Sequence, residues 1–304
     1  MSASLGPAVS GELIHVDGAA GRIGAYVDGD GPPMLLVHSV NAAASAAEVR
    51  PLHRHFRAHR TVFSIDLPGY GMSARSDRVY DPRLMTDALH AVIAHIRARF
   101  GGAPVDALAL SLSCEFLARA AVESPASIAT VALVSPTGFR GGQSLREAPG
   151  STLGKPWLLR ALRGPGWGRA LFAGLTRPGV VLYFLRRTFG RREIDDALWR
   201  QAVASAHQPG AEHAPLHFLA GALFSTDIHT VYEQVTQPVW VSHGVRGDFT
   251  DYRGLGLVAD RPNWRTTTYS TGALPYFEEP ARFCADYERF LAGGPDPDRE
   301  ASPP

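Results

Sequence analysis

The sequence alternates short apolar runs with amphipathic stretches of helical period, and this alternation is its strongest constraint on the fold. Four apolar runs predict strands buried on both faces: residues 34–37, 61–65, 107–110 and 128–134. Between them, one face of residues 81–99 carries apolar side chains at helical spacing. Strands that alternate with helices form parallel βαβ units. The chain therefore predicts an α/β fold with a mostly parallel central sheet flanked by helices.

The alternation is interrupted once, which suggests a division of the chain. Residues 143–224 are helical, aromatic and arginine-rich, and we expect them to form a helical cap over the sheet. A helical layer that merely completes the core is the alternative. The core is expected at 11–142 and 225–292, with flexible tails at 1–10 and 293–304.

Composition narrows the class of partner. The 30 basic and 29 acidic residues nearly balance, so no nucleic-acid partner is expected. No apolar run is long enough for a membrane span, and two cysteines make no disulfide framework, so we expect a cytoplasmic protein. The histidines show no metal-ligand spacing, and no metal or cofactor is expected. The excess of arginine in 143–224 fits a solvated face, or a docking surface for an acidic carrier protein.

Ser111 lies at the junction between the apolar run 107–110 and a following helical pattern. Small residues, Ala109 and Ser113, stand two positions before and after it. This layout is typical of a nucleophile elbow, a tight turn that raises a serine hydroxyl above the sheet. The usual glycines are absent from it. A serine that only caps a helix is the alternative.

Three further segments strengthen the case for a fold family. Residues 66–73 read D-L-P-G-Y-G-M-S, residues 238–248 combine a strand with H-G and an acid, and residues 272–280 read G-A-L-P-Y-F-E-E-P. Together with the elbow, these segments resemble the α/β-hydrolase fold family. The resemblance covers about residues 11–292 and is to the capped kind, which includes epoxide hydrolases, haloalkane dehalogenases and small esterases.

The resemblance implies roles for individual residues. Ser111 would be the nucleophile and Asp248 the acid of a triad, in the family's order. The backbone N–H groups of Leu112 and Val40 would form the oxyanion hole, where each donor is worth roughly 3 kcal/mol of barrier. The family's H-G pair corresponds to His38 and Ser39.

Next to that pair, Asn41 could offer a side-chain amide to the pocket. Asp66 would order its own loop rather than react. Nucleophilic aspartate chemistry is disfavoured, because the elbow residue is a serine.

The position that resembles the family's catalytic histidine holds Ala273. Three explanations are open: an alanine introduced deliberately to trap a ligand, a protein that has moved from hydrolysis to other chemistry, or a binding protein. Four other histidines could replace the base, although each could equally hold a loop: His38, His213, His217 and His243.

These residues predict an enzyme that acts on a small, mostly apolar molecule. One reaction class is ester or thioester hydrolysis through Ser111. The other is a non-hydrolytic elimination, cyclisation or rearrangement in the same pocket. A catalytically inactive receptor or pseudohydrolase is the alternative from a different class.

Overall fold

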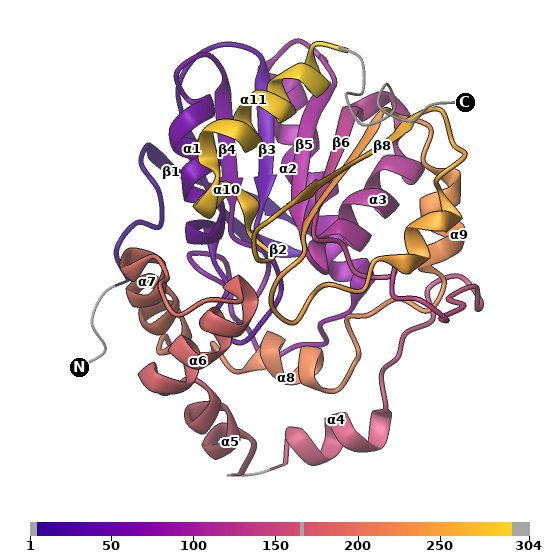
Figure 1. Ribbon diagram of the computed structural model, residues 1–304. Helices are drawn as coiled ribbons and strands as arrows, with labels where there is room; N and C mark the ends of the chain where they lie inside the picture. Colours follow the sequence, from indigo (N-terminus) through magenta and orange to yellow (C-terminus); the bar gives the residue numbers. More distant parts are fainter. Residues whose placement is uncertain (1–4, 165–166, 294–304) are drawn as a thin grey trace.

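The computed structural model describes residues 5–164 and 167–293, and one eight-stranded sheet forms its centre (Figure 1). The strand order is β1-β2-β4-β3-β5-β6-β7-β8. β2 pairs antiparallel with β1 and β4, and all other neighbours are parallel. The strands are β1 (Glu12–Gly18), β2 (Gly21–Asp28), β3 (Pro33–Val37), β4 (Thr61–Ile65), β5 (Val105–Leu110), β6 (Ile128–Val134), β7 (Val239–Gly244) and β8 (Trp264–Tyr269). The predicted, mostly parallel α/β sheet is confirmed.

Helices cover both faces of the sheet. One core cluster contains side chains of α2, α3 and α9, and the other contains side chains of α1, α10 and α11. Alternate residues of β3 divide between them, with Leu35 in the first cluster and Leu36 in the second. The pleat of a strand explains this division, because successive side chains point to opposite faces. The helices are α1 (Arg50–Phe56), α2 (Pro82–Arg99), α3 (Ser113–Glu123), α9 (Ile228–Gln234), α10 (Pro275–Glu278) and α11 (Pro280–Leu291).

The remaining helices form a group of their own between β6 and α9. They lie together below the sheet in Figure 1, and all fall within the range predicted as a cap. This group is α4 (Pro156–Leu162), α5 (Trp167–Leu175), α6 (Pro178–Phe189), α7 (Asp196–Ala206) and α8 (His213–Leu219). Three short 3₁₀ helices complete the described elements: η1 (Ala46–Val49), η2 (Pro125–Ser127) and η3 (Arg253–Leu257).

The loop after β4 is fixed by its own aspartate. The buried carboxylate of Asp66 accepts hydrogen bonds from the N–H of Ala46 at 2.7 Å and from that of Met72 at 2.8 Å. Gly71 has a φ of 46°, and a Cβ there would stand 1.9 Å from Asp66 Cγ. Only glycine therefore fits this close approach. The D-x-P-G-x-G-x-S segment ties the turn after β4 to η1.

The predicted N-terminal tail is partly packed. Ala8 and Val9 are buried in the cluster on the α1 face, so this part of 1–10 belongs to the core. Both side chains belong to the apolar cluster that also contains Tyr26 of β2 and Phe56 of α1. Residues 1–4 and 294–304 of the predicted tails lie outside the described residues. Within the described ranges, no helix is both long and apolar enough to cross a bilayer.

Candidate active site

Ser111 occupies a strained turn between β5 and α3. Its φ is 55°, in the left-handed region that residues with a side chain rarely adopt. Its N–H donates to the carbonyl of Val134 at 2.8 Å, and its carbonyl accepts from Cys114 N–H at 3.1 Å. Strain of this kind persists only where the surrounding structure enforces it, and it is concentrated at functional sites. The backbone at Ser111 is therefore that of a nucleophile elbow.

The small residue Ser113 has a second role in this turn. Its hydroxyl donates to the carbonyl of His38 at 2.6 Å, and both residues are fully buried. The bond joins the elbow to the loop after β3. A glycine at this position would satisfy the turn but not this carbonyl.

Two buried backbone donors border the same cavity as Ser111. Val40 is 3% exposed and Leu112 is 1% exposed, and both line this cavity. Within the described residues, neither N–H has a hydrogen-bond partner. Buried N–H groups are almost always paired, so two unpaired donors at one cavity mark a place for a negatively polarised oxygen.

The loop that carries Val40 is held by a buried carboxylate. Glu48 accepts hydrogen bonds from the N–H of Ser39 and from the side-chain amide of Asn41, both at 2.8 Å. The amide of Asn41 also donates to Ser39 Oγ at 2.9 Å. Asn41 lines the cavity, but its amide hydrogens are used within the loop. The structure thus gives Asn41 a positioning role.

The Ser111 cavity is small and mostly apolar. Its volume is about 140 Å³, and its walls come from the loops after the strands and from α6 and α8. The main apolar contributors are Leu110, Leu185, Phe218, Phe224, Phe249 and Leu274. Such walls exclude water and suit an apolar ligand with one polar group.

Ala273 lines this cavity, and its backbone is fixed on both sides. Its N–H donates to the carbonyl of Thr188 at 2.9 Å, and its carbonyl accepts from Ser135 Oγ at 2.8 Å. Among the described residues, those that line the cavity include no histidine.

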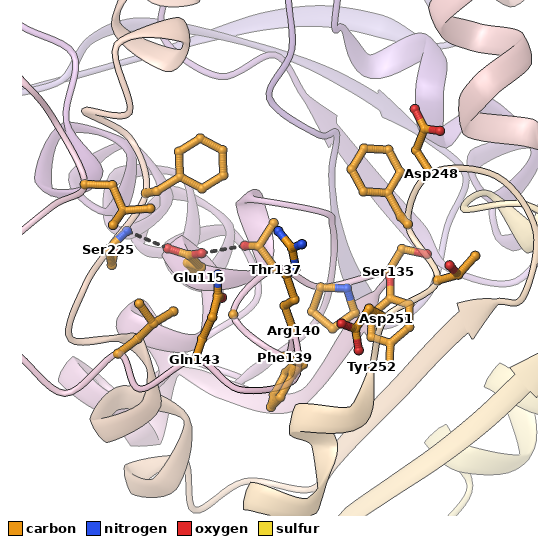
Figure 2. Close-up of a pocket in the computed structure, with 17 residues that line it drawn as sticks. Glu115, Ser135, Thr137, Phe139, Arg140, Gln143, Ser225, Asp248, Asp251 and Tyr252 are labelled. Atoms are coloured by element: carbon orange, nitrogen blue, oxygen red, sulfur yellow. Dashed lines mark hydrogen bonds between the residues drawn. The ribbon is translucent and has the colours of Figure 1, made fainter.

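Asp248 lies on the loop after β7 and is engaged elsewhere. Its carboxylate accepts from both Nε and Nη2 of Arg187 on α6, at 2.9 and 2.7 Å. The side chain is 38% exposed, and it lines a second cavity rather than the Ser111 cavity. In Figure 2 this carboxylate points away from the centre of the second cavity. The structure therefore brings Ser111, Val40, Leu112 and Ala273 together, but holds Asp248 against α6.

Two of the four candidate histidines, His38 and His243, are buried and hold neighbouring loops in place. His38 is fully buried, with Nδ1 bonded to the carbonyl of Ser39 and Nε2 accepting from Leu67 N–H at 2.9 Å. His243 stacks on Tyr252 at 4.0 Å, and burial lowers its pKa. Neither histidine lines the Ser111 cavity.

The two histidines of α8 are also directed elsewhere. His213 Nδ1 lies 3.6 Å from the carboxylate of Asp77, and His217 Nδ1 donates to the carbonyl of His213 at 2.9 Å. The ring of His217 packs against Tyr80, and burial lowers its pKa. Neither lines the Ser111 cavity, although Phe218 beside them does.

Several arginines of 143–224 are paired with acids. Arg187 is one, and others join the helices to each other or to core loops: Arg163 to Asp77, Arg169 to Glu212 and Arg191 to Glu278. These pairs account for much of the basic excess that the sequence suggested for a docking surface.

A larger cavity adjoins the first and contains a residue that the sequence analysis did not select. Its volume is about 500 Å³, and it shares Ser135, Thr137, Phe224 and Phe249 with the Ser111 cavity. Glu115 of α3 lies in its wall (Figure 2). The signal was present, because Glu115 is an acid between Cys114 and Phe116 on a helix expected to be buried.

Glu115 is 2% exposed and holds two hydrogen bonds. Thr137 Oγ1 donates to Oε1 at 2.5 Å, and the N–H of Ser225 donates to Oε2 at 2.9 Å, as the dashed lines in Figure 2 show. Burial raises its pKa from 4.5 to about 7. A carboxyl with this pKa exchanges protons near neutral pH.

Comparison with known proteins decides the family. The model of a family described as the alpha/beta hydrolase family matches residues 11–293. The chain belongs to the α/β-hydrolase family. This α/β hydrolase has no match among curated protein sequences.

Solved structures share its fold at low sequence identity. A serine hydrolase involved in carbazole degradation has a TM-score of 0.71 and 16% identity, over 93% of this chain and 99% of that chain. A putative aryl esterase from Burkholderia cenocepacia has a TM-score of 0.68 and 18% identity, over 93% and 98%. The carboxylesterase CesB from Bacillus subtilis has a TM-score of 0.68 and 17% identity, over 94% and 93%.

Proposed function

We propose that this α/β hydrolase is an enzyme that binds a small, mostly apolar carbonyl compound in the Ser111 cavity and transforms it without an acyl-enzyme intermediate. The reaction class is an elimination, cyclisation or rearrangement. The observation that carries the proposal is the pair of buried N–H groups of Val40 and Leu112 at the Ser111 cavity, which have no hydrogen-bond partner in the described part of the chain. They stabilise negative charge that develops on the carbonyl oxygen of the substrate.

Hydrolysis through Ser111 would need a base, and the carboxylate in the cavity wall, Glu48, is already used by its hydrogen bonds with Ser39 N–H and the amide of Asn41. A serine hydroxyl is a weak nucleophile until a neighbouring base takes its proton. Ala273 stands where the family carries that base, and His38, His213, His217 and His243 are bonded or directed elsewhere. Loss of a triad member leaves only the contribution of oxyanion binding and substrate binding. The scaffold would retain that contribution for other reactions.

Ester or thioester hydrolysis remains a second candidate because of the strained backbone of Ser111. A turn that served only to cap α3 would not need a φ of 55°. Under this alternative, either Glu48 in the cavity wall or a group outside the wall would have to deprotonate the serine.

Labelling with a fluorophosphonate probe separates the candidates, because the probe reacts with activated serines. We expect no labelling of the unsubstituted chain or of Ser111→Ala, and labelling of Ala273→His above both. Labelling of the unsubstituted chain at Ser111 would establish the hydrolytic alternative. A chain that binds carbonyl compounds but changes none of them would instead be a receptor.

A further inference from the structure

Glu115 and Thr137 connect the two cavities of the protein. Thr137 lines both cavities, whereas Glu115 lines only the larger one. The 2.5 Å hydrogen bond between their side chains therefore leads from the wall of the Ser111 cavity to a buried carboxyl.

We propose that Glu115 is the proton-exchanging group of this enzyme and that it acts on the substrate through the hydroxyl of Thr137. This inference rests on the proposed function of the Ser111 cavity and supplies a base for it, since the carboxylate of Glu48 in its wall is held by Ser39 and Asn41. The substrate class follows: a carbonyl compound with an acidic C–H or O–H bond next to the carbonyl group.

The hydrogen bonds of Glu115 allow two protonation states without rearrangement of the backbone. When Glu115 is ionised, Thr137 donates to Oε1 and presents an oxygen lone pair to the cavity. When Glu115 is protonated, Oε1–H donates to Thr137, whose own hydrogen then turns to the cavity. Ser225 N–H stays bonded to Oε2 in both states. Thr137 is thus an acceptor in one state and a donor in the other.

The step balances without any added reactant. The substrate bond to hydrogen breaks, its proton passes to Thr137 Oγ1, and the hydroxyl proton of Thr137 passes to Glu115 Oε1. The electron pair stays on the substrate, where the N–H groups of Val40 and Leu112 bind the resulting oxyanion. The proton returns along the same path to another atom of the substrate or to its leaving group.

The charges around Glu115 allow its carboxyl group to be either protonated or ionised near neutral pH. Arg119, one turn further along α3, directs its guanidinium to Asp227, with hydrogen bonds of 2.6 and 3.1 Å. The other titratable neighbours are Cys114 of α3 and Tyr232 of α9, both fully buried, and burial raises the pKa of each. Among the described residues, no basic side chain forms an ion pair with Glu115, although the charge of Arg119 lowers its pKa in part.

The wall of the larger cavity also contains a basic residue. Arg140 is exposed and lines the larger cavity, where Figure 2 shows its side chain. Burial is the largest cause of the shift in the pKa of Glu115, and the cation that lowers this pKa is Arg119, whose effect is smaller than that of burial.

Ring opening of 5-nitrobenzisoxazole tests the proposal, because a base removes one carbon-bound proton of the probe as its N–O bond breaks. We expect kcat/KM of the unsubstituted chain to rise with pH through about 7, as Glu115 ionises. Glu115→Gln, which resembles the protonated state, should lower kcat/KM by about 100-fold. Thr137→Val should lower it to the same level, and Thr137→Ser should restore it.

The matched control is Glu233→Gln, which removes a partly exposed acid paired with Arg146 and should leave the rate unchanged. An unsubstituted chain no faster than buffer, or as fast as Glu115→Gln, would overturn the proposal. Full activity in a folded Thr137→Val variant would overturn the relay.

Infrared spectroscopy gives a second test that needs no probe. The carboxyl band that Glu115→Gln removes should titrate near pH 7, and titration near 4.5 would contradict the proposal. The fluorophosphonate experiment reports on Ser111 alone, so failure of the proposed function and failure of this relay give different results.

Discussion

On one side of the Ser111 cavity, the elbow and the loop after β3 leave polar groups free for a ligand. The N–H groups of Val40 and Leu112 have no partner there within the described residues. On the other side, the loops after β7 and β8 give their polar groups to α6: Asp248 binds Arg187, and Ala273 N–H binds Thr188. The comparison teaches that, in one α/β hydrolase, two loops at the carboxyl edge of the sheet can hold a helix while two others line a cavity with backbone donors.

The largest expected effect comes from a variant that adds a base at position 273 and releases the carboxylate of Asp248 from Arg187. Ala273→His supplies a base, but Asp248 cannot orient it while Arg187 holds the carboxylate. We expect the double variant Ala273→His/Arg187→Met to react with fluorophosphonate about 1000-fold faster than the unsubstituted chain, because base and acid act as a unit. The labelling rate measures this.

Two controls test whether the gain in labelling depends on the carboxylate of Asp248. Arg163→Met removes a similar ion pair, to Asp77, and should not increase labelling when combined with Ala273→His. Adding Asp248→Asn to the double variant should abolish the gain. If the gain persists without the Asp248 carboxylate, that residue is not the acid.

The next effect concerns stability and the protonation of Glu115. Its pKa is about 7 when folded and 4.5 when unfolded, so folding favours the protonated form. The stabilisation is fully present below pH 4.5 and is lost as pH rises through 7, by up to about 3 kcal/mol. Urea unfolding at pH 5 and pH 8 should show this loss in the unsubstituted chain but not in Glu115→Gln.

Glu233→Gln is again the matched control, because Arg146 lowers the pKa of Glu233 below 4.5. Its carboxylate stays ionised between pH 5 and pH 8, so its removal should not change the pH dependence. An identical loss of stability in Glu115→Gln and the unsubstituted chain would contradict the raised pKa.

The smallest effect lies at the join between the elbow and the loop after β3. Ser113→Ala leaves the carbonyl of His38 without its 2.6 Å donor. We expect a loss of about 1 kcal/mol in the free energy of unfolding, measured with urea. Ser113→Gly should lose at least as much, although glycine is the residue usual in such turns. An unchanged stability in both variants would show that the bond is replaced by water.

Sequence patterns predicted the fold because each signal was local. Apolar runs such as residues 34–37 define strands buried on both faces, and Gly71 and Asp66 fit only one kind of turn. The position of Ser111 followed in the same way, since a strand and a helix meet there. The position of Ala273 in the cavity wall followed from its flanking residues.

The partners of side chains distant in sequence were beyond such patterns. The ion pair of Asp248 with Arg187 joins residues 61 apart, and no periodicity encodes it. The burial of Glu115 depends on how α3 packs beside Thr137 and Ser225, which spacing alone does not specify. His213 and His217 are turned from the cavity by contacts within α8 and with Asp77.

The contacts of α6 with the loops after β7 and β8 also affect how the sequence of this protein can evolve. The end of this helix binds both loops, and it contributes Leu185 and Thr188 to the cavity wall. A substitution that tilts the last turn of the helix would change the shape of the cavity. It would also change the ion pair of Arg187 with Asp248 and the backbone position of Ala273. New specificities should therefore arise through coordinated sets of replacements in this turn and the two loops, whereas the elbow can stay as it is.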